Sequence, residues 1–299
     1  MDQQGWLIER FEENRSRLRG VAYRMLGALS EAEDAVQEAW LRLSRTDAAT
    51  VDNLDGWLTT VVSRVCLDML RTRKSRREEP LGPQVTEVTV VGRDGADPEG
   101  EAVLADSVGV ALLVVLDTLT PAERLAFVLH DLFAIPFNEI GAIVGRSPDA
   151  AKQLASRARR RVRGSPAPSV AGRARQRTAV EAFLNAARAG DIEGLLAVLD
   201  PDAVIRIDAA ARMAGGAPDA APVAREVRGA STWVRRFVAL SRGMSFVQPA
   251  VINGAVGLIF APRGKLSRAL TFTFAGEKVT RIEVIGDPAR LGALEIGVL

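Results

Sequence analysis

The sequence predicts a multidomain protein in which two all-α domains precede an α+β domain. Three observations predict this class. Residues 6–78 and 104–163 carry apolar side chains at the spacing of amphipathic helices. Stretches rich in glycine and proline separate the segments, and the last third changes to the period-two alternation of strands. We therefore expect domains over residues 1–78, 104–165 and 174–299, with linkers at 79–103 and 166–173.

Composition and charge limit the function classes. At 299 residues and 47% hydrophobic, the chain has enough apolar material for several buried cores. The single cysteine, Cys66, excludes an intramolecular disulfide framework. We expect a soluble, cytoplasmic protein, because no signal peptide or apolar run of membrane-spanning length is present. Residues 104–177 hold 11 basic and 6 acidic residues, whereas residues 1–78 hold 13 of each. This excess predicts a nucleic-acid partner for the second domain.

The second domain has the pattern of a helix-turn-helix. Residues 120–123, Thr-Pro-Ala-Glu, form a capping box with proline at the first helical position. A shorter helix is expected at about 137–144, where Gly141 allows close helix contact and Gly145 ends the helix. Ser147 then caps a further helix.

Side chains on this last helix divide into two faces. The inward stripe is small and apolar: Ala151, Leu154, Ala155, Ala158 and Val162. The outer face is polar and mostly cationic: Lys152, Gln153, Ser156, Arg157, Arg159 and Arg160. A helix divided in this way fits the major groove of DNA. A solvated basic helix beside a loop is the alternative interpretation.

The first domain carries two further charged features. Residues 30–33 are expected to cap a helix that has an acidic polar face. The alternative interpretation is that this face only contacts solvent. A long helix is expected from Asn53 to Lys74. Five basic residues fall within seven positions at the end of this helix: Arg71, Arg73, Lys74, Arg76 and Arg77. The helix dipole accounts for one or two of them. The cluster therefore indicates contact with phosphates.

The third domain is expected to contain both helices and strands. The expected helices lie at about 175–189, 192–199 and 231–240, and the expected strands at 204–207, 246–253, 255–260, 268–274 and 279–285. Thr271 and Thr273 alternate with phenylalanines, which predicts a half-buried antiparallel sheet. We expect an α+β fold that closes around a cavity, and a turn or helix start at Asp287.

The first two domains, in their order along the chain, resemble bacterial extracytoplasmic-function (ECF) RNA polymerase sigma factors. Residues 34–42 (Asp-Ala-Val-Gln-Glu-Ala-Trp-Leu-Arg) are similar to region 2.2, residues 55–71 to regions 2.3 and 2.4, and residues 120–163 to region 4. The third domain resembles the cone-shaped, SnoaL-like (ketosteroid-isomerase/NTF2-like) extension of the SigJ-like group. Residues 208–212 read Asp-Ala-Ala-Ala-Arg where that group has Asp-Gly-Gly-Gly-Arg, and residues 287–291 read Asp-Pro-Ala-Arg-Leu in place of Asn-Pro-Asp-Lys-Leu.

The resemblance implies an alternative sigma factor that binds core RNA polymerase, through its beta-prime and beta subunits, and directs promoter-specific transcription initiation. Its activity would be modulated by the third domain. The implied polymerase contacts are Asp34, Gln37, Glu38, Trp40 and Leu41. The implied contacts with the −10 element are Asn53, Thr60, Ser63, Arg64, Arg71, Arg73 and Lys74. The implied contacts with the −35 element are Lys152, Gln153, Ser156, Arg157, Arg159 and Arg160. The regulatory candidates are Asp208, Arg212, Asp287 and Arg290.

We expect no enzymatic activity, no cofactor and no metal site. A ketosteroid-isomerase-type site needs a carboxylate base and a neutral oxyanion donor, and residues 172–299 contain no His, Tyr or Cys. We interpret this third domain as a regulatory domain that packs on the other two domains or binds a small apolar ligand. Two other classes remain. A one-component helix-turn-helix regulator with a C-terminal ligand-binding domain leaves the segments 34–41 and 71–77 without a purpose. A polyketide-cyclase-like enzyme fused to a DNA-binding module is the other.

Overall fold

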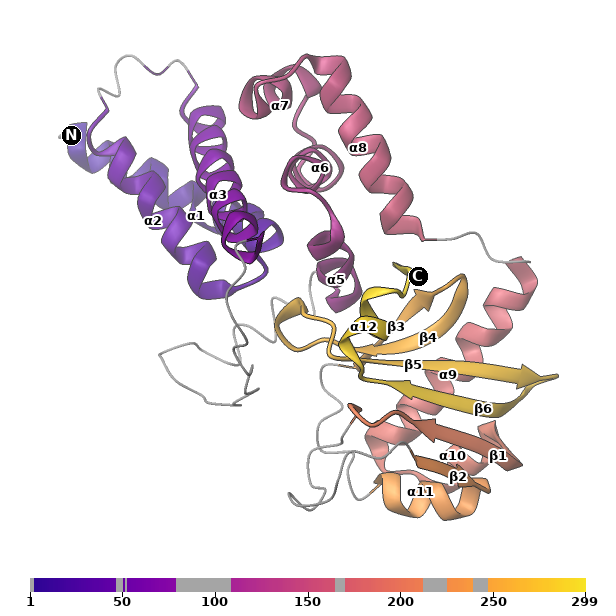
Figure 1. Ribbon diagram of the computed structural model, residues 1–299. Coiled ribbons are helices and arrows are strands. Elements are labelled where there is room, and N and C mark those ends of the chain that lie inside the picture. The colour runs from indigo at the N-terminus through magenta and orange to yellow at the C-terminus, as the bar shows by residue number, and fades with distance from the viewer. Residues whose placement is uncertain are drawn as a thin grey trace. The chain divides into compact units, whose positions relative to one another are not determined.

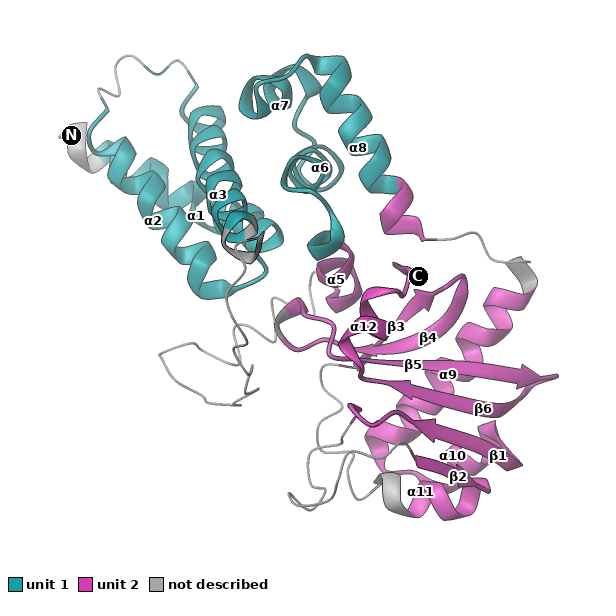
Figure 2. Cartoon of the chain, viewed as in Figure 1, with its two compact units in different colours: residues 1–108, 116–159 teal, residues 109–115, 160–299 magenta. Residues whose placement is uncertain are grey.

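The computed structural model describes residues 3–46, 51, 53–78, 109–164, 170–211, 225–238 and 247–299. The chain forms two compact units, residues 1–108 with 116–159 and residues 109–115 with 160–299 (Figure 2). The expected linker at 79–103, most of the loop at 46–53 and the candidate Arg212 lie outside the described residues, as do residues 165–169 of the second linker.

The described part of the first unit is helical (Figure 1). Its elements are α1 Gln3–Leu26, α2 Leu29–Leu43, α3 Leu54–Glu78, α6 Pro121–Phe127, a π-helix at Val128–Leu132, α7 Phe137–Val144 and most of α8 Pro148–Arg163. The core contains large, fully buried side chains from both predicted helical domains, among them Tyr23, Leu58, Leu125 and Ile140. The helices of the first two expected domains therefore share one compact unit.

Local capping follows the sequence at two helices and departs from it at one. At α6, Thr120 and Glu123 form the expected capping box, and the Ser147 hydroxyl accepts the amide of Ala150 at the start of α8 (3.2 Å). The capping box expected at residues 30–33 is wrong, because α2 begins at Leu29 with no side-chain cap. Glu33 lies instead 3.3 Å from Arg19 on α1, so its carboxylate is used between helices.

The turn before α8 depends on two glycines. Gly145 has φ +69° and ends α7, as the sequence predicts. A Cβ atom at Gly141 would lie 2.7 Å from the carbonyl oxygen of Arg146 and 3.3 Å from the backbone of Ser147. Only glycine leaves room for this close approach, which fixes where α8 begins.

The second unit contains a seven-stranded sheet with the order β2-β1-β6-β5-β4-β3-β7. The strands are β1 Leu199–Ile207, β2 Arg225–Arg228, β3 Val247–Ile252, β4 Ala255–Phe260, β5 Arg268–Ala275, β6 Lys278–Ile285 and β7 Ile296–Gly297. β1 and β6 pair in parallel and the other neighbours are antiparallel. The helices are α9 Val170–Ala189, α10 Ile192–Val198, α11 Ala230–Val238 and α12 Pro288–Gly292. This arrangement confirms the expected α+β fold.

Four elements of the second unit differ from the expectation. α9 begins at Val170 and β1 at Leu199, each five residues earlier than expected. The short strands β2 and β7 were not expected. Asp287, in contrast, caps the start of the helix α12, which confirms the turn or helix start expected there. β2 is held at the sheet edge by Arg206 on β1, which donates to Glu226 (2.7 Å) at the paired position.

Both faces of the sheet bury apolar side chains. One face packs against α9, α10 and α11 through a cluster that includes Phe183, Trp233 and Phe272. Neighbouring residues on a strand point to opposite faces, so Ala269 and Ile285, which are also buried, belong to the other face.

Residues 109–115 are part of this unit and include the first turns of α5 (Val110–Thr118). The amide of Val110 donates to the side chain of Gln248 on β3 (2.8 Å), and a Cβ at Gly264 would meet Leu113 at 2.9 Å. Two helices, α5 and α8, therefore continue from one unit into the other, as the two colours on each show in Figure 2.

Candidate polymerase and nucleic-acid interfaces

The exposed face of α2 presents most of the residues that the sequence assigned to polymerase binding. Asp34, Gln37 and Leu41 are exposed, and Leu41 keeps 40% of its surface free. Glu38 accepts a hydrogen bond from Arg42 (2.8 Å). Trp40 is half-buried and its ring packs on Phe11, with ring centroids 5.0 Å apart. An apolar anchor with an acidic rim is therefore in place.

A groove between α1 and α2 adjoins this face. Its volume is about 440 Å³, and it is lined by Ile8, Phe11, Glu12, Arg15, Glu33, Val36, Gln37 and Trp40. Gln37 and Trp40 thus belong both to the groove and to the predicted polymerase surface. The α1 residues of the groove were not predicted from the sequence. Ile8, an apolar side chain that is 47% exposed, is the one signal among them.

The α3 candidates for the −10 element occupy different environments. The Asn53 side chain accepts the amide of Gly56 (3.0 Å) and so stabilises the start of α3. The Thr60 hydroxyl donates to the carbonyl of Gly56 (2.9 Å). Ser63 is fully buried, and its hydroxyl has no hydrogen-bond partner among the described residues. Because Ser63 lies in the core, its side chain cannot reach a DNA base, and Ser63 is not part of this surface.

The basic residues of α3 are partly engaged within the first unit. Arg64 is exposed, and its guanidinium lies 3.4 Å from the carbonyl oxygen of Ala142 on α7. Arg71 lies 3.7 Å from Asp68, with both side chains exposed. Arg73 forms an ion pair with Glu31 on α2 and also donates to the carbonyl of Leu26 (3.3 Å). The side chain of Lys74 lies outside the described set.

The outer face of α8 separates into free and engaged residues. Lys152, Gln153, Ser156 and Arg160 are exposed. Arg157 instead donates to Glu123 of the α6 capping box (3.0 Å). Arg159 pairs with Asp131 at 2.5 Å. These two arginines join α8 to the rest of the helix-turn-helix, whereas the other four face solvent.

Arg124 is a buried connecting residue that was not predicted from the sequence. Its side chain is 4% exposed, and its guanidinium donates to the carbonyls of Leu116 (2.6 Å) and Met25 (2.7 Å) and to Asp117 (3.1 Å). Met25 lies on α1, so Arg124 connects the region 2-like helices to the helix-turn-helix. Arginine in an amphipathic helix normally predicts exposure, and no signal in the sequence marks this one as buried.

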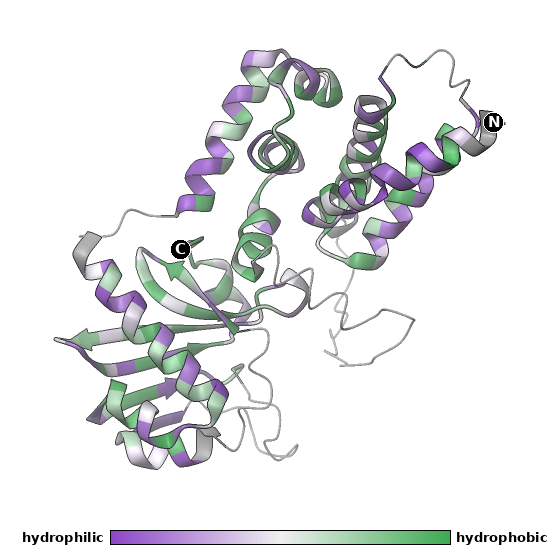
Figure 3. Cartoon of the chain, turned by 180° about the vertical axis from the view of Figure 1, so that it is seen from behind, coloured by the Kyte–Doolittle hydropathy of each residue, from purple (hydrophilic) through white to green (hydrophobic). Residues whose placement is uncertain are grey.

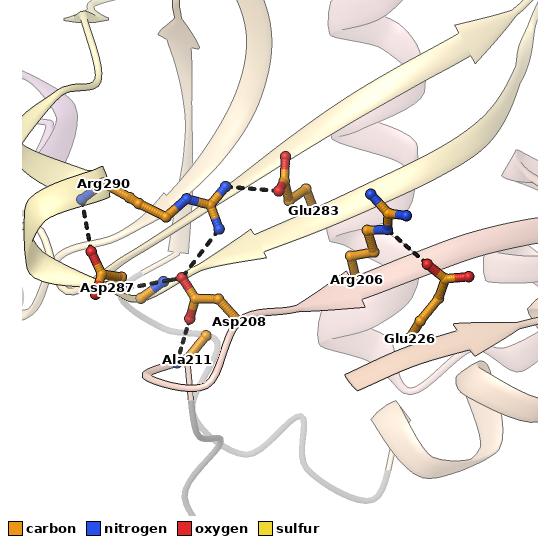
Figure 4. A network of polar contacts seen from close by, with 8 residues as sticks. Arg206, Asp208, Ala211, Glu226, Glu283, Asp287 and Arg290 are labelled. Atoms are coloured by element: carbon orange, nitrogen blue, oxygen red, sulfur yellow. Dashed lines mark hydrogen bonds and ion pairs between the residues drawn. The ribbon is translucent and has the colours of Figure 1, made fainter. Parts of the chain in front are cut away.

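A polar network holds the regulatory candidates of the second unit (Figure 4). The Asp208 carboxylate accepts the amides of Ala211 (2.7 Å), Gly286 (2.8 Å) and Asp287 (3.0 Å). Arg290 lies 3.6 Å from Asp208 and donates to Glu283 (2.7 Å). The described part of the first motif, residues 208–211, is thus adjacent to residues 287–290 of the second.

This network favours the ionised form of the Asp208 carboxyl group. Partial burial opposes the charged form, but the amides of Asp287, Gly286 and Ala211 together with Arg290 outweigh burial and lower the pKa of Asp208. A carboxylate held ionised by three amides is a structural anchor and a weak general base.

Two further findings concern other kinds of site. No group of three or more His, Cys, Asp or Glu side chains that could hold a metal ion occurs in the described ranges. None of the described helices is both long and apolar enough to cross a membrane.

Comparison with known proteins identifies the family. Models described as "Sigma-70 region 2" and "Sigma-70, region 4" match residues 10–76 and 109–162. The ECF RNA polymerase sigma factor SigJ of Mycobacterium tuberculosis is 40% identical over 260 residues, which cover 84% of this chain and 80% of that protein. The probable ECF RNA polymerase sigma factor SigI of the same species is 34% identical over 282 residues, which cover 94% of this chain and 93% of that protein.

A crystal structure of the SigJ protein aligns with 95% of this chain and 98% of its own, at 34% identity and a TM-score of 0.45. The assignment rests on the sequence relatives and on the two regions in their order along the chain. The chain belongs to the extracytoplasmic-function RNA polymerase sigma factors.

Proposed function

We propose that this sigma factor uses three separate surfaces in transcription initiation. The exposed face of α2, centred on Asp34, Gln37 and Leu41, docks on the coiled coil of the beta-prime subunit of RNA polymerase. Acidic side chains around an apolar anchor suit a basic partner that carries leucines. The polymerase contact is expected to extend along Trp40 into the groove between α1 and α2.

The second surface is the exposed side of α3, which binds the melted −10 strand. Asn53, Thr60, Arg64 and Arg71 remain candidates here because all four reach the surface at least in part. Single-stranded DNA needs a cationic track and pockets for extruded bases. Arg73 acts mainly through its ion pair with Glu31, which fixes α3 against α2.

The third surface, on α8, reads the −35 element, and one observation carries this proposal. The four exposed residues Lys152, Gln153, Ser156 and Arg160 share the side of α8 that is opposite its buried alanines. Lys152 and Gln153 lie in the first turns of the helix, where a recognition helix contacts base edges. Arg157 and Arg159 position the helix through their ion pairs.

The experiment uses holoenzyme assembled from core polymerase and the full chain, with promoters selected from a random duplex pool. Lys152→Glu with Gln153→Ala should abolish selection of a −35 sequence while the variant still joins the polymerase. Asp34→Lys with Leu41→Asp should weaken assembly itself. Arg235→Gln on α11, an exposed arginine of the second unit, is the control for both. If neither double variant differs from this control, the assignment of α2 and α8 is wrong.

The second unit is proposed to regulate these surfaces through protein contacts and not through catalysis. It already contains the first turns of α5 and the end of α8. The site proposed for a small apolar ligand lies between α9 and the sheet, where Phe183 packs on Trp233 and Phe272 at centroid distances of 6.0 and 5.4 Å. Thermal-shift screening of apolar compounds tests for such a ligand.

Deletion of residues after about 172 tests the regulatory role. The truncated chain should change the rate of initiation at the selected promoters, because it removes the partner of Val110 and Leu113. Unchanged transcription together with unchanged polymerase affinity would refute the role.

A further inference from the structure

An arginine-rich stretch crosses from α8 into α9. Between residues 150 and 180 the chain has nine basic residues, no Asp or Glu and no aromatic residue. Part of the stretch belongs to α8 and the −35 surface proposed above. The remainder, from Arg173 to Arg177, lies on α9 in the second unit, to which the proposed function gives no contact with DNA.

The end of α8 is fixed to the sheet of the second unit. The amide of Val298 donates to the carbonyl of Val162 (2.8 Å). Gly164 and Gly297 approach so closely that a Cβ on either would lie 3.0 Å or less from the backbone of the other. The same Cβ on Gly164 would lie 3.8 Å from the side chain of Val251 on β3.

The start of α9 is fixed to the same part of the sheet. The side chain of Gln176 accepts the amide of Val256 on β4 (3.3 Å). Val256 is paired with Val251 across the β3–β4 hairpin, and Val251 is also paired with Gly297. Since paired strands lie about 5 Å apart, the end of α8 and the residues around Gln176 are anchored to neighbouring positions of one hairpin.

The arginines at these two helix ends are accessible. Arg160, Arg163 and Arg175 are exposed and form no ion pair with any residue that the structure describes. Arg177 instead pairs with Glu181 (2.7 Å). It lies about 200° from Arg175 around α9 and so belongs to another side of the helix.

The α8 arginines Arg160 and Arg163 lie on the same side of α8 as the proposed −35 surface. At about 100° per residue, Arg160 and Arg163 fall within about 80° of Lys152 around the helix. They therefore extend the proposed −35 face along α8 toward the hairpin. Figure 3 shows hydrophilic residues along both α8 and α9.

We propose that Arg160, Arg163 and Arg175 form one cationic surface that binds the phosphate backbone of duplex promoter DNA beside the −35 element. The second unit is then a DNA-binding part of the sigma factor. This inference rests on the proposed −35 role of α8. Charge complementarity and continuity with that surface favour DNA. An acidic protein partner fits less well, because protein interfaces are enriched in aromatic anchors and this stretch has no aromatic residue.

The test compares Arg175→Gln with a matched control that removes one exposed arginine elsewhere on the second unit, Arg235→Gln. Holoenzyme binding to a selected promoter is measured as a function of salt. Each lost phosphate contact lowers the salt slope of log K by about 0.9. We expect a decrease of about 0.9 in this slope for the α9 variant, together with several-fold weaker binding, and no change for the control.

A second probe, trimmed to the borders of the −35 and −10 elements, locates the contact. The α9 variant and the wild-type chain should bind this short duplex equally. Equal slopes for the α9 variant and the control on the long fragment would overturn the inference, as would weaker assembly with polymerase in place of weaker DNA binding. Failure of the wild-type holoenzyme to select any −35 sequence is a separate result, which contradicts the proposed function itself.

Discussion

Arg124 shows how one side chain connects two segments that are far apart in the sequence. It bonds Leu116, eight residues away, and Met25 on α1, with the guanidinium almost fully buried. Ser63 shows the converse, since a polar residue that the sequence assigned to a DNA surface lies in the core. At this scale residue type predicts exposure only on average, because the packing partners are distant in sequence.

Arg124→Met is expected to destabilise the first unit. The change removes the Arg124 donor from the carbonyl of Met25, and it leaves the carbonyl of Leu116 with the amide of Leu119 alone. A buried carbonyl that loses its donor costs about 1–3 kcal/mol. Urea unfolding followed by circular dichroism measures the loss. Arg42→Met, which removes an exposed pair with Glu38, is the control and should cost about 0–1 kcal/mol. Equal midpoints for the two variants would contradict the connecting role of Arg124.

Asp208→Asn is expected to lower the melting temperature of the second unit at neutral pH. Because the folded-state pKa of Asp208 is lowered, its stabilisation is present above the unfolded-state pKa of about 3.9 and is lost as the pH falls through the folded value. The difference between wild type and variant should therefore shrink below about pH 4. Thermal unfolding from pH 3 to 8 checks this, with Glu277→Gln on the β5–β6 turn as control. A difference that is constant with pH rules out the ionised anchor.

Elements follow the sequence where the signals are local. The α6 capping box, the α7–α8 turn and the strands β3 to β6 were all predicted, since helix caps, turn glycines and alternation depend on neighbouring residues. The edge strand β2 was missed because three of its four residues are charged, which obscures the alternation. Its position depends on Arg206 of β1, a pairing that no local pattern contains.

Gly141→Ala is expected to disrupt the helix-turn-helix and leave the polymerase surface intact. The added methyl group would meet the Arg146 carbonyl at 2.7 Å, and overpacking of this kind costs about 1–3 kcal/mol. Fluorescence anisotropy with a selected promoter should show weaker binding, whereas assembly with core polymerase through α2 stays normal. Ala142→Ser, at the exposed neighbouring position, should change neither. Normal promoter binding by Gly141→Ala would show that the turn adapts.

On the scale of the whole molecule, the division into units differs from the order of the segments along the chain. α5 and α8 each contribute residues to both compact units. The apolar run at 110–116 could be recognised as a helix from the sequence, but its burial against Gln248 and Gly264 could not.

Gly297→Val is expected to release the end of α8 from the sheet. Its side chain would collide with the backbone of Gly164, where a Cβ already approaches to 2.8 Å. Hydrogen exchange at residues 160–164 and 296–299 should accelerate, while β5 and β6 stay protected. Gly292→Ala, which meets nothing within 4 Å, is the matched control. Unchanged exchange at 160–164 would show that Val298 does not hold this helix.

The sequence by itself determined the family, the order of the helical and α+β segments, the helix-turn-helix and the cationic face of α8. Each of these depends on residue type and on spacing within about twenty positions. The tertiary structure alone decided that Ser63 is buried, that Arg157 and Arg159 are used in ion pairs, and that α8 and α9 meet at one hairpin. Those outcomes depend on contacts between residues far apart in the chain, and such contacts are selected by the packing of the whole core.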